Sequence, residues 1–446
     1  MKSRWDPTRR ELIALGGAAV ATAGSLGSSA FAQGGANTLK VGAIFPSSSG
    51  VTRIRTSIND FTGDGARQGS LLAEQRIGTL VSETGLNLLV LQANAPTPAA
   101  AIRAAERLVE FDKVDALLGG VGEGQLEPLI GIAERAGVPL LNIGTPDDVF
   151  RQDRCNRNLF HVEPSDAMYL DSMVQWSAAR GHRRWFIVNQ DSERGHARQA
   201  AAVRAVARHG AGGEVVGAAS TVFEQPSYFA LINEARRTGA DAILVILGVT
   251  DQIAFSGQFD AAWGEPTLVA FPDPPGQTRD FILALRQMTV GYTPEFRFQS
   301  WDPSLETNGA ADFNNIYATR FAAPAEPSAW SSFNAVKMLY EAAVATGTTD
   351  GDALISHLET SDDEFDLMKG PGSSFRSWDH QLRQPVYSIE IDLDLVLVEA
   401  LVGTSLRSQI EVASVESILP TRGASQGTTA WLDQIGDGPD RSLCAL

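Results

Sequence analysis

The chain has 446 residues, of which 43% are hydrophobic and 20% are charged. This is the balance of a globular protein, and the length predicts about three folding units, or two lobes with additional elements. Asp and Glu outnumber Lys and Arg by 53 to 36, and the net charge of −17 argues against nucleic-acid binding, which needs a basic surface. Two cysteines and six scattered histidines without an HExxH pair do not predict a metal site.

The first 32 residues have the pattern of an export signal. Arg9 and Arg10 precede a short apolar stretch at 12–24, and Ala30-Phe31-Ala32 provides a cleavage site of the A-x-A type. The paired arginines favour the twin-arginine route, and a general secretory signal that contains two arginines is the alternative. The apolar stretch is shorter than the roughly 20 residues of a membrane span, so we expect a soluble mature protein in the periplasm.

Short runs of β-forming residues alternate with helical stretches along most of the chain. The first group consists of predicted strands at 39–45, 86–92, 114–119 and 138–142 and predicted helices at 65–78, 97–111 and 127–136. The pattern restarts with predicted strands at 185–188, 214–219, 242–247 and 267–271 and predicted helices at 195–209 and 227–238. Strands that alternate with helices indicate βαβ units and parallel sheets, so the predicted fold class is α/β with two such units.

The last third of the chain has a different pattern. A helix is predicted at 329–345, and residues 385–397 alternate between apolar and polar side chains as an antiparallel strand does. Residues 404–446 are rich in Gly, Ser, Pro and Asp, which predicts a tail with little regular structure. Two α/β units in series on an exported chain favour a hinged receptor with a ligand between the lobes, outside the carboxyl ends of the strands.

Four segments carry a family resemblance: VDALLG at 114–119 with the Gly-rich turn after it, AGVPLLN at 136–142, FEQPSYFALI at 223–232 and WSSFNAV at 330–336. They resemble the leucine- and amide-binding receptors of ABC importers, the type I periplasmic binding proteins. The resemblance covers about 38–400 and implies two Rossmann-like lobes joined by a hinge. It implies lobe 1 at 33–160 and about 285–369, lobe 2 at 161–284 and about 370–403, and a C-terminal tail at 404–446.

Two further segments carry a narrower likeness: CNRNLFH at 155–161 with PSDAM at 164–168, and KG at 369–370 with SFRSWDHQLRQP at 374–385. They resemble a subfamily of these receptors that is associated with pyrroloquinoline-quinone-dependent alcohol dehydrogenase systems. The residues DQIG at 433–436 and Cys444 resemble the tail of that subfamily. The association is with the system, so it implies neither a quinone cofactor nor an enzymatic activity for this chain.

In the family, the turns after the third and fourth strands bind the carboxylate of an amino acid through hydroxyls and N–H groups at helix starts. The matching residues are Glu123 and Gly124 in the first turn and Gly144 and Thr145 in the second. Glu123 stands where the family has a hydroxyl, and an ionised glutamate would repel a carboxylate, so a neutral or cationic ligand fits better. The alternative is that Glu123 faces solvent or caps the helix.

The second lobe of the family binds an amino group with aromatic and acidic residues. Asp273, in FPDP at 271–274, matches the acidic position, although an Asp between prolines also forms turns. Arg194 replaces an aromatic ring that covers the ligand, and it is either a guanidinium for an oxyanion or a solvated surface residue. Asp251 begins a helix after an apolar strand and is either a ligand contact or an N-cap.

Cys155 and Cys444 form the one possible intrachain disulfide, since export makes such a bond possible, and two buried thiols are the alternative. No nucleophile elbow, activated thiolate or histidine motif favours an enzyme, and no motif requires a cofactor. We therefore expect a monomeric receptor that captures a small solute and presents it to an inner-membrane ABC permease, without a nucleic-acid partner. The alternative is a ligand-free periplasmic scaffold or a sensor that supports a dehydrogenase.

Overall fold

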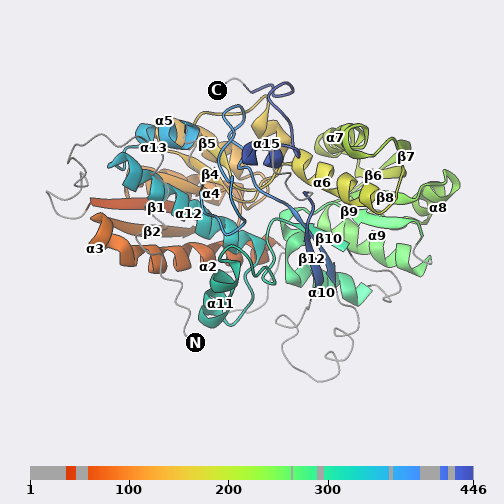
Figure 1. The fold of residues 1–446 in the computed structure, drawn as a ribbon, viewed down its shortest axis with the longest axis horizontal. Coiled ribbons are helices and arrows are strands. Elements are labelled where there is room, and N and C mark those ends of the chain that lie inside the picture. The colour runs from red at the N-terminus through yellow and green to blue at the C-terminus, as the bar shows by residue number, and fades with distance from the viewer. Residues whose placement is uncertain are drawn as a thin grey trace.

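A computed structural model describes residues 37–46, 59–262, 265–288, 296–360, 365–391, 412–419, 427–444 and 446. The predicted export signal at 1–32 and the part of the predicted strand beyond residue 391 lie outside these ranges. Figure 1 shows two α/β bodies side by side along the long axis, which we call lobe 1 and lobe 2. The predicted α/β class with two units is confirmed. Among the described residues, no helix combines the length and apolar character that crossing a membrane requires.

Lobe 1 is built on a five-stranded parallel sheet with the strand order β2-β1-β3-β4-β5. Helices α2 and α12 pack on one face of this sheet, and α4 and α5 pack on the other, so both faces are buried. The strands are β1 (Asn37–Phe45), β2 (Leu86–Asn94), β3 (Ala116–Gly119), β4 (Leu140–Asn142) and β5 (Leu159–His161). The helices are α2 (Asn59–Ile77), η3 (Gly78–Leu80), α3 (Val81–Thr84), α4 (Pro98–Glu110), α5 (Leu126–Ala136), η4 (Asp148–Arg151), α11 (Ala310–Phe321), α12 (Pro327–Thr346) and α13 (Gly351–Thr360).

Lobe 2 is built on a four-stranded parallel sheet with the order β7-β6-β8-β9. Helices α6 and α7 pack on one face, and α8 and α9 pack on the other. Strand β8 is buried along its whole length, as its apolar sequence AILVI predicts for a strand covered on both faces. The strands are β6 (Arg184–Gln190), β7 (Glu214–Thr221), β8 (Ala242–Ile246) and β9 (Thr267–Ala270). The helices are α6 (Asp166–Ala179), α7 (Glu193–His209), α8 (Phe229–Arg237), α9 (Val249–Ala261), η5 (Pro274–Gln277) and α10 (Arg279–Met288).

A third, antiparallel sheet lies against lobe 2, with the order β10-β11-β12. Its strands are β10 (Phe296–Gln299), β11 (Tyr387–Ile391) and β12 (Val412–Ser417). The predicted antiparallel strand is confirmed for its described part, β11. The prediction of little regular structure after residue 404 was wrong for β12 and for helix α15 (Thr428–Leu432), because apolar residues of this segment, such as Leu432 and Ile435, are buried in the core of lobe 2.

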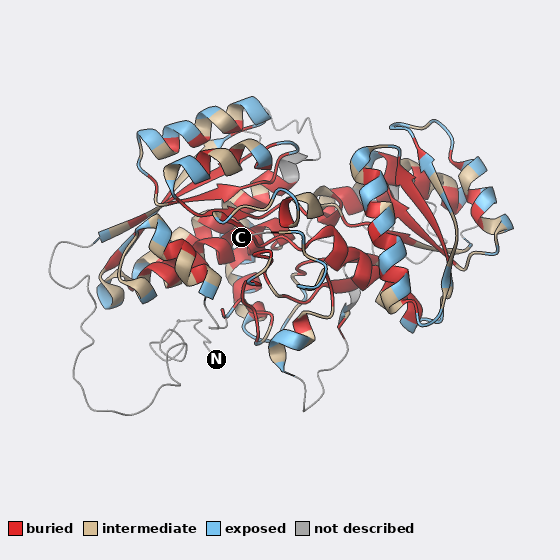
Figure 2. Ribbon diagram, turned by 90° about the horizontal axis from the view of Figure 1, so that it is seen from above, coloured by how far each residue is buried: buried red, intermediate tan, exposed pale blue. Residues whose placement is uncertain are grey.

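The described chain passes between the cores of the two lobes at three places. The residues on either side of these crossings are Val162 and Met168, Phe298 and Trp301, and Leu382 and Val386. Figure 2 shows that buried residues continue through the junction of the two lobes. These crossings mark where the two cores meet.

The buried side chain of Arg151 connects the first crossing to the third. Its Nε donates to Oε1 of Gln381 at 2.6 Å, and its Nη2 donates to the carbonyl oxygen of Glu163 at 2.8 Å. Its Nη1 donates to the carbonyl oxygens of Thr145 and Asp147 at 3.2 and 3.0 Å. Because hydrogen bonds of one planar guanidinium reach all these groups, the turn after β4 and the two crossings hold a fixed geometry.

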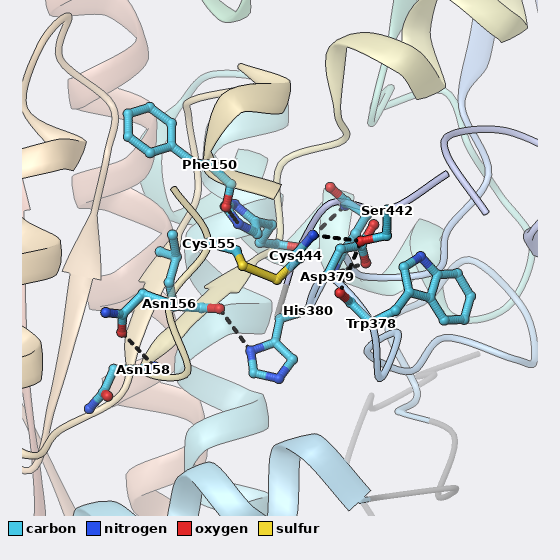
Figure 3. The surroundings of a disulfide bond; sticks show 12 residues. Phe150, Cys155, Asn156, Asn158, Trp378, Asp379, His380, Ser442 and Cys444 are labelled. Atoms are coloured by element: carbon cyan, nitrogen blue, oxygen red, sulfur yellow. Dashed lines mark hydrogen bonds between the residues drawn. A yellow bond between two sulfur atoms is a disulfide. The ribbon is translucent and has the colours of Figure 1, made fainter. Parts of the chain in front are cut away.

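A disulfide joins Cys155 of lobe 1 to Cys444, with the two Cα atoms 5.6 Å apart (Figure 3), so the predicted pairing is confirmed. The segment before Cys444 also binds lobe 2. Arg208 donates to the carbonyl oxygen of Gly436 at 3.1 Å, and the Gly436 N–H donates to Oδ2 of Asp171 at 2.8 Å. The C-terminal segment therefore spans both lobes.

Replacing Cys444 by Ser should lower the free energy of unfolding by about 2–4 kcal/mol, because the unfolded chain regains the freedom that the cross-link removes. Urea unfolding followed by circular dichroism measures the change. A reducing agent should lower the stability of the wild type to the value of the variant and leave the variant unchanged. Equal stability of the oxidised wild type and Cys444→Ser would contradict a stabilising bond.

Candidate functional site

A small pocket lies between the lobes, and we call it the hinge pocket. Lobe 1 contributes the first turns of α2 and α12 and the turn after β4, and lobe 2 contributes η5 and the residue after it. The lining residues are Thr62, Ile143, Glu163, Pro274, Gln277, Thr278, Pro327 and Ser328. The cavity has a volume of about 10 Å³, the space of about one water molecule, so a solute fits there only when the lobes or the lining side chains move.

Glu163, in the first crossing, is a buried acid within a network of hydrogen bonds. Tyr169 donates its hydroxyl hydrogen to Oε1 of Glu163 at 2.7 Å and accepts from Nε2 of Gln277 at 2.8 Å. Oε1 of Gln277 accepts the backbone N–H of Ser300, in the second crossing, at 3.0 Å. Burial raises the pKa of Glu163 to about 7. A group that titrates near neutral pH therefore lies between two of the crossings.

Three helices begin at the hinge pocket. Thr62 lies in the first turn of α2, Thr278 directly precedes α10, and Pro327 and Ser328 open α12. Helix N-termini carry a partial positive charge, so these three starts face the pocket with the same sign. The side-chain oxygens of Thr62 and Ser328 are buried and have no hydrogen-bond partner within the described residues. A buried hydroxyl without a partner costs about 1–3 kcal/mol, so both oxygens favour the binding of a guest.

A second buried acid, Glu326, lies next to the pocket. Its Oε1 accepts the backbone N–H of Arg279, the first residue of α10, at 3.3 Å, and its Oε2 lies 4.0 Å from Nη1 of Arg279. Burial raises the pKa of Glu326 to about 7. Glu163 and Glu326 together oppose the positive ends of the three helices, so the surroundings of the pocket are close to electrical balance.

A cluster of ion pairs lies in the cleft between the lobes, and we call it the cleft cluster. It joins Asp147 of lobe 1 to Arg194, Arg198, Asp166 and Asp273 of lobe 2. Arg194 lies 3.5 Å from Asp147 and 3.9 Å from Asp273, and Arg198 lies 2.9 Å from Asp166 and 2.6 Å from Asp273. Burial raises the pKa of Asp273, but the charges of Arg198 and Arg194 outweigh it and lower this pKa overall. In the ranges that the structure describes, no three acidic, His or Cys side chains are grouped to hold a metal ion.

The structure brings two of the residues selected from the sequence together in the cleft cluster, Arg194 and Asp273. The side chain of Arg194 is 39% exposed, so its ion pairs are weak, and Arg198 holds Asp273 more tightly, through both carboxylate oxygens at 3.2 and 2.6 Å. Arg194 is nevertheless the residue of this cluster that pairs with an acid of lobe 1, Asp147.

Gly144 and Thr145 lie on the lobe 1 side of the cleft, directly after Ile143 of the pocket lining. Oδ1 of Asn142 accepts the backbone N–H groups of Gly144 and Thr145 at 3.2 and 2.9 Å. The Thr145 hydroxyl donates to the carbonyl oxygen of Gly120 at 2.6 Å. The chain itself therefore uses the hydrogen-bond donors of this turn.

The other residues selected from the sequence lie outside the cleft cluster. Glu123 and Gly124 are exposed in the turn between β3 and α5. Asp251 is buried inside lobe 2, where its Oδ1 accepts the Tyr228 hydroxyl at 2.7 Å and the backbone N–H of Glu224 at 2.9 Å. These bonds fix the segment before α8 and leave Asp251 with a role in the fold of lobe 2.

The sequence analysis missed most of the hinge pocket. Thr62, Glu163, Gln277 and Ser328 come from four separate segments, and no motif connects them. Two signals were available: Glu163 directly precedes the PSDAM segment, and Ser328 lies two residues before WSSFNAV. Neither signal indicates which side chains face a ligand.

A sequence profile for a family described as periplasmic binding protein matches residues 38–394. No match was found among curated proteins. The matched range contains both parallel sheets and every residue that lines the hinge pocket.

Solved structures of solute-binding proteins share the fold. A branched-chain amino acid ABC transporter periplasmic ligand-binding protein from Burkholderia xenovorans LB400 is 16% identical, with 85% of this chain and 95% of that chain covered and a TM-score of 0.70. The branched-chain amino acid transporter substrate-binding protein LivJ from Streptococcus pneumoniae, in complex with isoleucine, is 17% identical, with 85% and 99% covered and a TM-score of 0.65. An ABC transporter solute-binding protein from R. palustris, in complex with 4-hydroxybenzoate, is 15% identical, with 87% and 100% covered and a TM-score of 0.66. With the profile match over most of its length, this two-lobed chain belongs to the periplasmic binding protein family, whose members act outside the cytoplasm and are not enzymes.

Proposed function

We propose that this chain is an exported receptor that captures a small solute between lobe 1 and lobe 2 and presents it to an ABC permease in the inner membrane. The observation that carries the proposal is the hinge pocket, which both lobes line and in which the hydroxyls of Thr62 and Ser328 have no partner within the described chain. A solute there contacts both lobes at once and stabilises their closed arrangement over an open one. The permease would distinguish the closed form from the open one.

The cleft cluster acts in this proposal as a latch. Asp147 lies in lobe 1, and Arg194 and Asp273 lie in lobe 2, so Arg194 meets Asp147 only when the lobes are close together. We assign Arg194 and Asp273 to the closure of the cleft rather than to direct contact with the solute.

The two turns of lobe 1 form the outer part of the proposed site. Gly144 and Thr145 follow Ile143, which lines the hinge pocket, and a Cβ atom at Gly144 would lie 2.7 Å from Cα of Val121. Glycine therefore allows the close approach of the two turns. Glu123, with Gly124, is exposed beside them, and its charge disfavours an anionic solute.

The relatives and the narrower resemblance support a small organic solute in a periplasmic setting. Two of the similar structures hold isoleucine and 4-hydroxybenzoate. Alcohols, aldehydes, quinone precursors, amides and amino acids are candidate ligands here. The segments at 155–168 and 369–385 link the receptor to a pyrroloquinoline-quinone-dependent alcohol oxidation system. The signal at 1–32 would direct the chain to the periplasm by the twin-arginine route, where it acts as a monomer.

A second candidate function is a ligand-free scaffold for a periplasmic dehydrogenase. Two observations favour it: Asn142 uses the N–H groups of Gly144 and Thr145, and Arg194 occupies the cleft. A scaffold would bind an enzyme and no solute, so the two functions predict different partners.

A thermal-shift screen of residues 33–446 tests the receptor. The library contains amino acids, amides, short alcohols and acids, and pyrroloquinoline quinone. A ligand at about 100 times its Kd adds about 2.7 kcal/mol of stability and raises the melting temperature. Ser328→Ala should reduce the shift, and Ser82→Ala, at an exposed position of α3, should leave it unchanged. A screen without a shift, together with a dehydrogenase that co-purifies from periplasm, would favour the scaffold.

Reversing the charge of Arg194 should open the cleft. Arg194→Glu replaces the ion pair by repulsion from Asp147 and Asp273, which should shift the equilibrium by about 1 kcal/mol towards the open form. Small-angle X-ray scattering should show a larger radius of gyration. Arg204→Glu, at an exposed position of the same helix, is the control. An unchanged radius in both variants would exclude the latch.

The titration of Glu163 should lower the stability of the ligand-free protein as the pH rises from about 4.5 to 7. In this window the folded state keeps a proton on Glu163, whose pKa rises from 4.5 to about 7, while the unfolded state loses it, and the difference amounts to about 3 kcal/mol. Glu326 acts in the same direction, and His380, whose pKa burial lowers to about 4, acts in the opposite one.

Glu163→Gln isolates the contribution of Glu163, since the amide still accepts the Tyr169 hydroxyl. Urea unfolding at pH 5 and pH 8 should show a smaller fall in the free energy of unfolding for this variant than for the wild type. The contributions of Glu326 and His380 are present in both proteins. An identical fall in both would contradict the raised pKa of Glu163.

A further inference from the structure

The turn after β4 has the geometry of an anion site, and a side chain of the chain already fills it. Two successive backbone N–H groups, of Gly144 and Thr145, point at one oxygen atom, as in backbone concavities that bind anions. That oxygen is Oδ1 of Asn142, the last residue of β4, which is fully buried. Asn142 therefore occupies two N–H groups that an oxygen of a carboxylate could otherwise accept.

His161 fixes the orientation of the Asn142 amide. Nε2 of His161 lies 3.1 Å from the carbonyl oxygen of Phe150, which only accepts, so Nε2 carries the hydrogen. Nδ1 of His161 therefore accepts from Nδ2 of Asn142 at 3.0 Å, and the same amide nitrogen donates to the carbonyl oxygen of Thr145 at 2.7 Å. Burial lowers the pKa of His161 well below its usual value, which keeps the ring neutral. The amide cannot turn its oxygen away from the two N–H groups without losing both bonds.

The hinge pocket beside this turn offers uncharged partners. The hydroxyls of Thr62 and Ser328 have no partner within the described chain, and Gln277 contributes an amide. Glu163 is among the lining residues and no Lys or Arg is, so a carboxylate in the pocket would meet an acid. A cationic ligand would face the positive ends of three helices. The lining therefore favours neither sign of charge strongly.

We propose that Asn142 makes the receptor selective for uncharged solutes that carry hydroxyl or amide groups, over carboxylates. The inference rests on the proposed receptor function and names the class of its solute. A hydroxyl or a primary amide both donates and accepts hydrogen bonds, which matches the hydroxyls of Thr62 and Ser328. Asn142 acts as a specificity-determining residue because it withholds the two N–H groups that a carboxylate needs.

Calorimetric titration of the wild-type chain with three probes of equal carbon number tests the proposed class of solute. Propionamide, propionate and n-propylammonium differ mainly in charge. Propionamide should bind about tenfold or more tightly than either ion, since a buried charge without a partner costs more than an amide that finds its hydrogen bonds. Binding of propionate or n-propylammonium as tight as that of propionamide would overturn the proposal.

Two variants test the role of Asn142. Asn142→Ala exposes the N–H groups of Gly144 and Thr145, so the affinity for propionate should rise about tenfold or more, which a merely structural role would not produce. Asn142→Asp keeps an oxygen in the same place, so it should show no gain. Circular dichroism checks that both variants fold. If folded Asn142→Ala gains no affinity for propionate, Asn142 is not the determinant.

The outcomes separate this inference from the receptor function. If Asn142→Ala does not fold, the titration of the wild type still decides between the classes of solute. If none of the three probes binds the wild type, the proposal fails in this form. The wider thermal-shift screen then decides independently whether the chain is a receptor, because a carboxylate identified there would leave the receptor function intact and overturn only the class proposed here.

Discussion

The hydrogen bonds of the buried Arg151 guanidinium are the interaction on which the junction of the lobes depends. They reach the carbonyl oxygens of Thr145 and Asp147 after β4, the carbonyl oxygen of Glu163 in the first crossing, and the side chain of Gln381 beside the third. A guanidinium is stable in such a place only when partners replace its water. The turn that holds Asn142 and the wall of the hinge pocket that holds Glu163 are both attached to it, so their relative position follows from this one side chain.

The electrostatics of the pocket follow from this arrangement. Three helix starts meet where the chain passes between the lobes, and two buried acids, Glu163 and Glu326, oppose them with raised pKa values near 7. The result is a polar pocket that is close to neutral, in which the hydroxyls of Thr62 and Ser328 have no hydrogen-bond partner within the described residues. The cleft cluster, in contrast, consists of strong charges that compensate one another. In the proposed receptor, the ion pair of Arg194 with Asp147 joins the lobes, and neutral polar groups face the solute.

Much of the fold could be predicted from the sequence, because buried parallel strands such as β8 are continuously apolar and alternate with amphipathic helices. The turn that holds Gly144 and Thr145 was also found, through its resemblance to a family. The hinge pocket could not be found, because its residues are distant in sequence and become neighbours only at the crossings. The local sequence pattern also left open whether Asp251 contacts a ligand or caps a helix. Its hydrogen-bond partner Tyr228 is known only from the packing of α8 against α9.

The disulfide between Cys155 and Cys444 encloses the whole chain of lobe 2 in a covalent ring that begins and ends at lobe 1. The bond can form only after Cys444, which lies 289 positions after Cys155, has been synthesised. Once the bond has formed, the chain of lobe 2 has no free end when the lobe unfolds. Its chain stays tethered on both sides, so it gains less entropy on opening and its ends remain close for refolding. The ring therefore biases local unfolding away from lobe 2, and a protease that cuts an exposed loop there leaves the two fragments joined.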